Sequence, residues 1–214
     1  MVLILASARH SFAQKVFSEG TLTYKISIQS SKGESALSNN LSGAELKVYL
    51  KPSASRTEMI NSLGTESTVY DSRQEKGFIL KEYSGQKLMI TATKENWKEK
   101  NRWNNNLRFS IDNSVVNIEG YQCKKATAST QDGRTFEIYF TPDIVPSNKD
   151  YNNSFDQLPG LPVQYSLTSG NLTIKHTLNR ISYDAVPMVK FDIPKAGYRV
   201  MTYEENQQLK KEGK

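Results

Sequence analysis

The sequence predicts a single mainly β domain, and two observations carry this prediction. Apolar and polar residues alternate along most of the chain, which is the pattern of half-buried strands. In one early segment, Leu22, Tyr24 and Ile26 share a face while the residues between them are polar. Turn signals such as Ser84-Gly85 and Asp132-Gly133 separate successive segments. We therefore expect antiparallel strands joined by short connections.

Helical signals are few. Thr202 and Glu205 form a capping-box pattern, which predicts a helix ending near Gly213. Residues 95–106 form either a second helix or a loop. The expected strands are bounded by turn residues and fall at 20–29, 45–51, 55–60, 67–71, 77–82, 86–93, 115–130, 134–140, 163–167, 171–179 and 187–193.

The 214 residues are enough for one β-rich domain, which we place at 15–214. Residues 1–14 resemble a signal peptide, because an apolar run leads into small residues that suit cleavage near Ala13 or Gln14. The positively charged segment that normally precedes such a run is missing, which indicates a truncated start. The alternative is an amino-terminal strand or a disordered tail. We expect a periplasmic or secreted protein, since no later segment approaches the roughly 20 apolar residues of a membrane-spanning helix.

Charge and cysteine content narrow the function further. The formal net charge is +6, but basic residues between Lys94 and Arg102 are interleaved with Glu95 and Glu99, so no basic patch for nucleic acid is expected. Weak attraction to anionic lipid headgroups is the more plausible effect. Cys123 is the only cysteine, which excludes an intramolecular disulfide and predicts a buried, inert thiol.

The motif Leu-Pro-Gly-Leu-Pro precedes an alternating segment and predicts a structural element. Pro159 and Gly160 suit a type II turn, in which glycine adopts the positive φ. Leu161 is biased toward extended geometry by the proline that follows it. Pro162 has no N–H for a ladder, so it belongs at the first residue of a strand or on an edge.

This motif also carries a family resemblance. The stretch from Phe140 to Leu167 resembles an exported family of unknown function from Gram-negative envelopes, related to the GLPGLI-type proteins. The segments 120–126 and 191–205 are similar to the same family. Such families look like distant relatives of the lipoprotein carriers LolA and LolB. The resemblance implies a single curved antiparallel sheet that forms an incomplete, half-closed barrel, with capping helices or loops over an apolar concavity. The alternation, which predicts about eleven to thirteen strands, is compatible with such a sheet.

Recognisable catalytic patterns are missing from the sequence. One histidine and one cysteine in the mature chain cannot build a standard His/Cys metal site, and no nucleophile elbow or phosphate-binding loop occurs. We therefore predict a protein that is not an enzyme and needs no cofactor or metal. An unrecognised hydrolase with a carboxylate pair on distant strands is the remote alternative.

Binding is the function that the sequence favours. Trp97 and Trp103 lie among basic and amide residues, which suits a lid over an apolar cavity, a membrane-interface contact, or simple packing of a loop onto the sheet. Tyr165 and His176 share the phase of apolar neighbours and are expected in the core or the cavity wall. With these four residues as candidate ligand contacts, we predict a monomeric carrier of a lipid, an acyl chain or another hydrophobic ligand. The alternative is a structural protein that docks an envelope partner or a peptide on its sheet.

Overall fold

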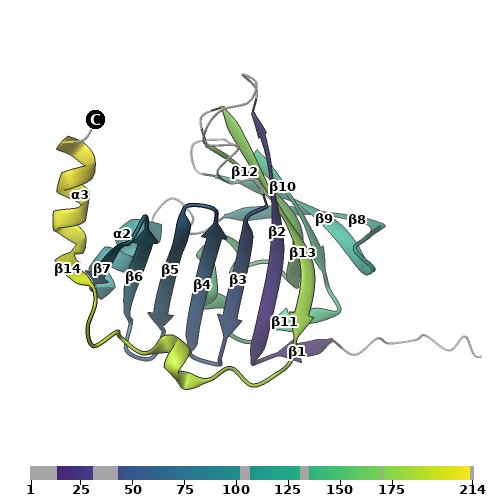
Figure 1. Cartoon of the computed structure of the whole chain (residues 1–214). Coiled ribbons are helices and arrows are strands. Elements are labelled where there is room, and N and C mark those ends of the chain that lie inside the picture. Colours follow the sequence, from purple (N-terminus) through teal and green to yellow (C-terminus); the bar gives the residue numbers. More distant parts are fainter. Residues whose placement is uncertain (1–13, 31–42, 102–106, 131–134, 170, 213–214) are drawn as a thin grey trace, which may run out of the picture.

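The structure is a computed structural model that describes residues 14–30, 43–101, 107–130, 135–169 and 171–212. Within these ranges the chain forms a mixed sheet of twelve strands, a separate pair of short strands and two α-helices (Figure 1). The predicted mainly β class is confirmed. The sheet stays open and does not close into a barrel. It is also not wholly antiparallel, because its last strand joins in the parallel sense.

The large sheet has the strand order β14-β7-β6-β5-β4-β3-β2-β13-β12-β10-β9-β8. Its strands are β2 (Gly20–Ser30), β3 (Glu45–Leu50), β4 (Ala54–Asn61), β5 (Gly64–Asp71), β6 (Lys76–Tyr83), β7 (Gln86–Ala92), β8 (Arg108–Ile118), β9 (Tyr121–Ser129), β10 (Thr135–Thr141), β12 (Leu161–Ser169), β13 (Leu172–Ser182) and β14 (Arg199–Thr202). The second sheet pairs β1 (Lys15–Phe17) with β11 (Ile144–Pro146) in parallel. The helical elements are α2 (Lys94–Asn101), α3 (Tyr203–Glu212) and the 3-10 turns η1 (Lys149–Tyr151), η2 (Asn153–Phe155) and η3 (Met188–Phe191).

Capping boxes begin both α-helices. At α3, the Glu205 carboxylate accepts a hydrogen bond from the Thr202 N–H at 2.7 Å, and the Thr202 hydroxyl accepts one from the Glu205 N–H at 3.2 Å. The predicted box is thus confirmed. At α2, Thr93 and Asn96 exchange the equivalent pair of hydrogen bonds at 3.0 and 3.3 Å. The helical part of the predicted segment 95–106 is α2, and residues 102–106 lie outside the described residues.

The main core lies on one face of the sheet, and the register shows why. Side chains opposite one another on neighbouring antiparallel strands share a face, so one row runs Tyr24, Leu46 and Leu178, and the next contains Ile26, His176 and Tyr165. Phe155 and Leu158, from the segment that precedes β12, are buried in the same cluster. This face is therefore sealed by the chain's own side chains. Cys123 is buried there as expected, and burial raises the pKa of its thiol to about 11.

The opposite face of β4–β7 is covered by residues 186–198, which we call the strap. In Figure 1 the strap crosses β3 to β6 near their lower ends, between β13 and β14. Phe191 and Tyr198 of the strap pack on a buried cluster that includes Val69 and Phe78. The predicted strand at 187–193 is wrong, because this segment forms η3 and lies across the strands instead of beside one.

Two further differences from the prediction have local causes. The single strand expected at 115–130 is a hairpin of β8 and β9, because Glu119 and Gly120 both adopt positive φ, 50° and 86°, and reverse the chain. The short strands β1, β11 and β14 were not predicted. They have three or four residues each, too few for alternation to distinguish them from loops.

The Leu-Pro-Gly-Leu-Pro motif is structural, but the predicted positive φ at Gly160 is wrong. Glycine is needed because a Cβ there would lie 2.2 Å from the backbone oxygen of Thr141. β12 begins at Leu161, and Pro162 lies beside an irregular step in the pairing of β12 with β10. The buried hydroxyl of Tyr24 donates to the Pro162 carbonyl oxygen at 2.9 Å, which fixes this end of the strand.

Candidate binding pocket

A pocket of about 730 Å³ lies between the strap and the end of the sheet that carries the β5–β6 turn. Most of its lining comes from β5 to β7 with the residues between β5 and β6, from the start of α2, and from the strap, and single residues of β4, β14 and α3 complete it. The residues that line it are Ala54, Val69, Tyr70, Asp71, Gln74, Glu75, Lys76, Gly77, Phe78, Thr91, Ala92, Thr93, Lys94, Glu95, Asn96, Met188, Phe191, Asp192, Ile193, Thr202 and Glu204.

The facing walls of this pocket are apolar. Val69 and Phe78 are register partners on β5 and β6, and both are nearly fully buried. Across from the sheet, Met188, Phe191 and Ile193 come from the strap. Met188 and Ile193 are about 60% exposed (62% and 60%), so apolar surface of the strap is left uncovered at the pocket. The walls therefore offer contact area to an apolar group.

The rim of the pocket is charged and mainly acidic. Among the described residues that line it, two are basic, Lys76 and Lys94, and five are acidic: Asp71, Glu75, Glu95, Asp192 and Glu204. Lys94 forms an ion pair with Glu75, so one positive charge is already matched within the rim. The side-chain amide of Asn96 donates to Glu204 at 2.5 Å, which ties the start of α2 to the start of α3.

Two of the rim carboxyl groups are held in the ionised form. The hydrogen bond from Asn96 lowers the pKa of Glu204. Backbone hydrogen bonding at the start of α2 lowers the pKa of Glu95, with a smaller contribution from Thr93. The rim is therefore negative at neutral pH, although the whole chain carries a formal charge of +6.

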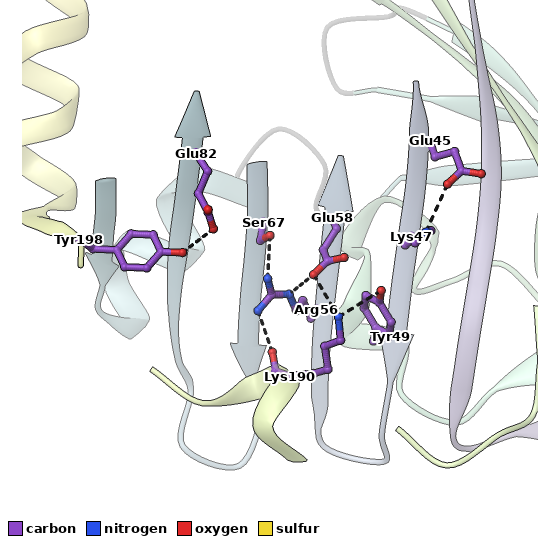
Figure 2. Close-up of polar contacts among 9 residues, drawn as sticks. All are labelled: Glu45, Lys47, Tyr49, Arg56, Glu58, Ser67, Glu82, Lys190 and Tyr198. Atoms are coloured by element: carbon purple, nitrogen blue, oxygen red, sulfur yellow. Dashed lines mark hydrogen bonds and ion pairs between the residues drawn. The ribbon is translucent and has the colours of Figure 1, made fainter. Parts of the chain in front are cut away.

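A cluster of polar residues fixes the strap to the sheet beside the pocket (Figure 2). The guanidinium of Arg56 donates to the Glu58 carboxylate at 2.6 Å, to the Ser67 hydroxyl at 3.1 Å and to the Lys190 backbone oxygen at 3.0 Å. We call these four residues the clamp. Glu58 is only 7% exposed and Ser67 only 2%, so the clamp is largely shielded from water. Removing one partner of such a shielded pair leaves the other charge buried without its partner, which strongly destabilises the folded protein.

The Lys190 side chain adds contacts on the other side of Glu58. Its Nζ lies 3.8 Å from the Glu58 carboxylate, donates to the Tyr49 hydroxyl at 3.4 Å and sits 4.5 Å from the centre of the Tyr49 ring. Burial and the neighbouring Glu58 charge raise the pKa of Tyr49 to about 12. η3 is thus attached through both its backbone and its lysine side chain.

Two further contacts hold the ends of the strap. The N–H of Val186 donates to the Glu19 carboxylate at 2.8 Å, and Lys51 pairs with the same carboxylate at 2.6 Å. At the other end, the Tyr198 hydroxyl donates to Glu82 on β6 (Figure 2). The pocket-lining stretch of the strap therefore lies between fixed points.

Trp97, one of the two predicted lid residues, lies beside the pocket without lining it. Trp97 of α2 is 7% exposed and stacks on Tyr70, with the ring centres 4.7 Å apart and the planes nearly parallel. Tyr70 lines the pocket, so the indole packs on one residue of the pocket wall. Trp103 lies outside the described residues.

Tyr165 and His176 are brought together, but in the main core and not at the pocket. Their rings stack with centres 4.4 Å apart, and Phe155 packs edge-on against Tyr165. The two side chains are 5% and 4% exposed. Burial lowers the pKa of His176 to about 4, so the imidazole is neutral at physiological pH. Of the predicted ligand contacts that the structure describes, Tyr165 and His176 are therefore in contact in the core, and Trp97 packs on Tyr70 instead.

Sequence reasoning missed the pocket because its two walls are far apart in the chain. The strap was interpreted as another strand, which hid the fact that Phe191 packs across the face of β5 and β6. One signal was present: acidic residues gather at the ends of neighbouring segments, at Asp71, Glu75 and Glu95. Adjacent antiparallel strands place such ends at one edge of the sheet.

The described ranges contain no candidate metal site and no candidate membrane-spanning helix. No group of three or more His, Cys, Asp or Glu side chains there is arranged to hold a metal ion. Nor does any helix in those ranges have the length and apolarity needed to cross a bilayer.

Comparisons with known proteins give only distant structural similarity. No family model matches the chain, and no curated protein matches it. Structures of PNGF-II match with TM-scores of 0.48 and 0.49 at 11% identity, over 89% of this chain. MucB matches with a TM-score of 0.39 at 9% identity over 82% of this chain, and the MucA/MucB complex of Pseudomonas aeruginosa with 0.40 at 10% over 81%.

These matches cover only part of the other proteins. The chain spans about a third of PNGF-II, 32–33%, and somewhat more than half of MucB, 56–58%. At such identities and TM-scores, the site has to be interpreted from the residues of this chain alone.

Proposed function

We propose that this protein is an exported, non-enzymatic binding module, and that it holds the apolar part of a ligand in the pocket between the strap and β5–β7. The observation that carries the proposal is the pocket itself, which is lined by Val69 and Phe78 of the sheet and by Met188, Phe191 and Ile193 of the strap. Its volume of about 730 Å³ lies within the range of small-molecule sites. Apolar walls with a few polar groups at the rim are typical of such sites.

A lipid or acyl ligand is the finer form of this proposal. Each buried methylene contributes roughly 0.8 kcal/mol, so about ten of them offer on the order of 8 kcal/mol before the costs of association. The carrier role implied by the resemblance to LolA and LolB agrees with an apolar ligand. The ligand site proposed here, however, lies under the strap. The main core is filled by its own side chains, including Tyr24 and Phe155.

The carboxyl groups at the rim are suited to holding negative charge. Hydrogen bonds lower the pKa of both Glu95 and Glu204, which keeps these two groups ionised at neutral pH.

Displacement of a neutral fluorescent probe such as N-phenyl-1-naphthylamine by decanol tests the proposal. Thr91 lines the pocket and is exposed, so Thr91→Trp fills the pocket and should lower the affinity for decanol at least about tenfold, since roughly two methylenes' worth of burial is lost. Thr168→Trp adds the same indole at an exposed position of β12 and should change nothing. Equal affinities of the two variants for decanol would contradict the proposal. So would the absence of decanol binding together with the absence of lipid in organic extracts of natively purified protein.

Docking of a protein partner is a second candidate, and β8 favours it. Among the described strands, β8 has only β9 as a neighbour, and Ile111, Val115 and Val116 on it are 39–57% exposed. An extended peptide that pairs with this edge would satisfy its open backbone groups. In-cell cross-linking followed by mass spectrometry should then find one partner attached to β8, and Val115→Pro should abolish the attachment. Cross-links scattered over the whole surface would count against this function.

A further inference from the structure

We propose that the ligand of the pocket is a small cationic amphiphile, with an alkyl or acyl chain against the apolar walls and a protonated amine at the carboxylate rim. This inference rests on the proposed function, because it adds a headgroup charge to the apolar ligand described above. Charge complementarity carries it. The chain as a whole is basic, and a random part of its surface would repel a cation, yet the pocket rim is acidic.

The charges at the rim do not cancel one another. Lys94 is matched by Glu75. Of the remaining charged residues that line the pocket, one is positive and four are negative: Lys76, and Asp71, Glu95, Asp192 and Glu204. An ammonium group entering the pocket therefore meets a net negative field, and the apolar walls around it reduce screening by water.

The start of α2, which would attract an anion, is already occupied by groups of the chain itself. The start of α2 carries partial positive charge, and it borders the pocket through Thr93, Lys94 and Glu95. The capping box between Thr93 and Asn96 uses N–H donors of this helix start, and the Glu95 carboxylate lies in its first turn. An anionic headgroup would have to displace these groups, whereas a cation would pair with Glu95.

The carboxylates of the pocket come from separate parts of the chain. Asp192 lies between Phe191 and Ile193 on the strap, and both of these neighbours line the pocket. Glu95 comes from α2 and Glu204 from α3, and Asn96 holds Glu204 in place. An amine bound in the pocket therefore has carboxylates of the strap and of both helices among the lining residues, next to the apolar ones that its chain would contact.

Three probes with the same chain separate the headgroup charge from the apolar contribution. Decylammonium, decanol and decyl sulfate are titrated into the full chain by calorimetry, below their critical micelle concentrations. Decylammonium should bind about five times more tightly than decanol or better, and decyl sulfate should bind most weakly. The differences in affinity between the three probes should become smaller as salt is raised from about 0.02 M to about 0.5 M, because salt screens the charges of the rim.

Matched double variants assign the effect to the rim. Asp192→Asn with Glu95→Gln should lower the affinity for decylammonium about four- to twentyfold and leave that for decanol unchanged. Asp143→Asn with Glu137→Gln removes the same charge from exposed positions on β10 and its following turn, outside the pocket, and should leave both affinities unchanged.

The outcomes distinguish this inference from the function on which it rests. If the three probes bind equally, or if both double variants weaken decylammonium alike, the cationic headgroup is wrong and the apolar pocket stands. If none of the probes binds, both proposals fail. If a peptide of alternating leucine and lysine residues binds the pocket while decylammonium does not, the small amphiphile is wrong and a basic peptide takes its place.

Discussion

The guanidinium of Arg56 donates a hydrogen bond of 3.0 Å to the backbone oxygen of Lys190, and this contact joins β4 to the strap. The same guanidinium pairs with Glu58, which also lies 3.8 Å from the Lys190 ammonium group. The positive Arg56 thus holds the backbone oxygen of Lys190, and the negative Glu58 lies near the side-chain ammonium group of the same residue. Because Phe191 follows Lys190 directly and lines the pocket, the clamp sets the position of the pocket wall.

Arg56→Ala should destabilise the protein by about 2–4 kcal/mol, because it leaves the shielded Glu58 carboxylate with Lys190 as its remaining charged partner. It should also weaken decanol binding, since the strap loses its contact at Lys190. Urea unfolding measures the first effect, and probe displacement measures the second.

The double variant Arg56→Met with Glu58→Met separates these two effects. Replacing both charges by apolar side chains of similar size should recover most of the stability. The hydrogen bond to the Lys190 backbone is still missing, so amide hydrogens of η3 should exchange faster than in the wild type. Unchanged exchange in η3 would show that the clamp does not hold the strap.

Much of the sheet could be predicted from the sequence because strand alternation is a local property. Leu22, Tyr24 and Ile26 on β2 and Leu46 and Val48 on β3 show their common buried face in the sequence itself. The capping box of α3 is equally local, since both of its hydrogen bonds join residues three apart. Such local features can be predicted without knowing which segments pack on the faces of the sheet.

The pocket could not be predicted, because it depends on which face the strap covers. Residues 187–193 contain enough apolar residues to suggest a strand, but a strand needs a neighbour with free backbone groups. In this segment the Lys190 N–H instead donates a hydrogen bond to the Pro187 carbonyl oxygen, within a single turn. Tyr165 and His176 show the same limit: their phase predicted the core or a cavity wall, and only tertiary packing placed them in the core.

The close approach at Gly160 makes a prediction that differs from that of a type II turn. Both Gly160→Ala and Gly160→Asn should destabilise by about 2 kcal/mol or more, because any Cβ meets the Thr141 backbone oxygen. A positive φ would instead favour Asn over Ala. Gly197 is the control, with φ of 86° and open space around it, and there Asn should be tolerated better than Ala. Thermal unfolding of the four variants decides between the two explanations.

Removal of the Tyr198 hydroxyl should be visible at Glu82. The hydrogen bond from Tyr198 is the largest contribution that lowers the pKa of Glu82, and Lys87 adds to it. Tyr198→Phe should therefore raise the pKa of Glu82 toward its usual value, as measured by carboxyl NMR titration. Tyr83→Phe changes a tyrosine on the same strand as Glu82 and should leave the pKa of Glu82 unchanged. A Glu82 pKa that does not respond to Tyr198→Phe would mean that the strap end is not held by this contact.

His176 should make the protein less stable in mild acid. Burial lowers its pKa from 6.5 to about 4, so below pH 6.5 the unfolded chain binds a proton that the folded protein does not. Stability should therefore fall as the pH drops from 6.5 to about 4, by about 2–3 kcal/mol in total. His176→Phe keeps a ring against Tyr165 but cannot titrate, and all carboxyl contributions are common to both proteins. Urea unfolding at pH 7 and 4.5 should show the smaller loss in His176→Phe, and equal losses would place the acid sensitivity elsewhere.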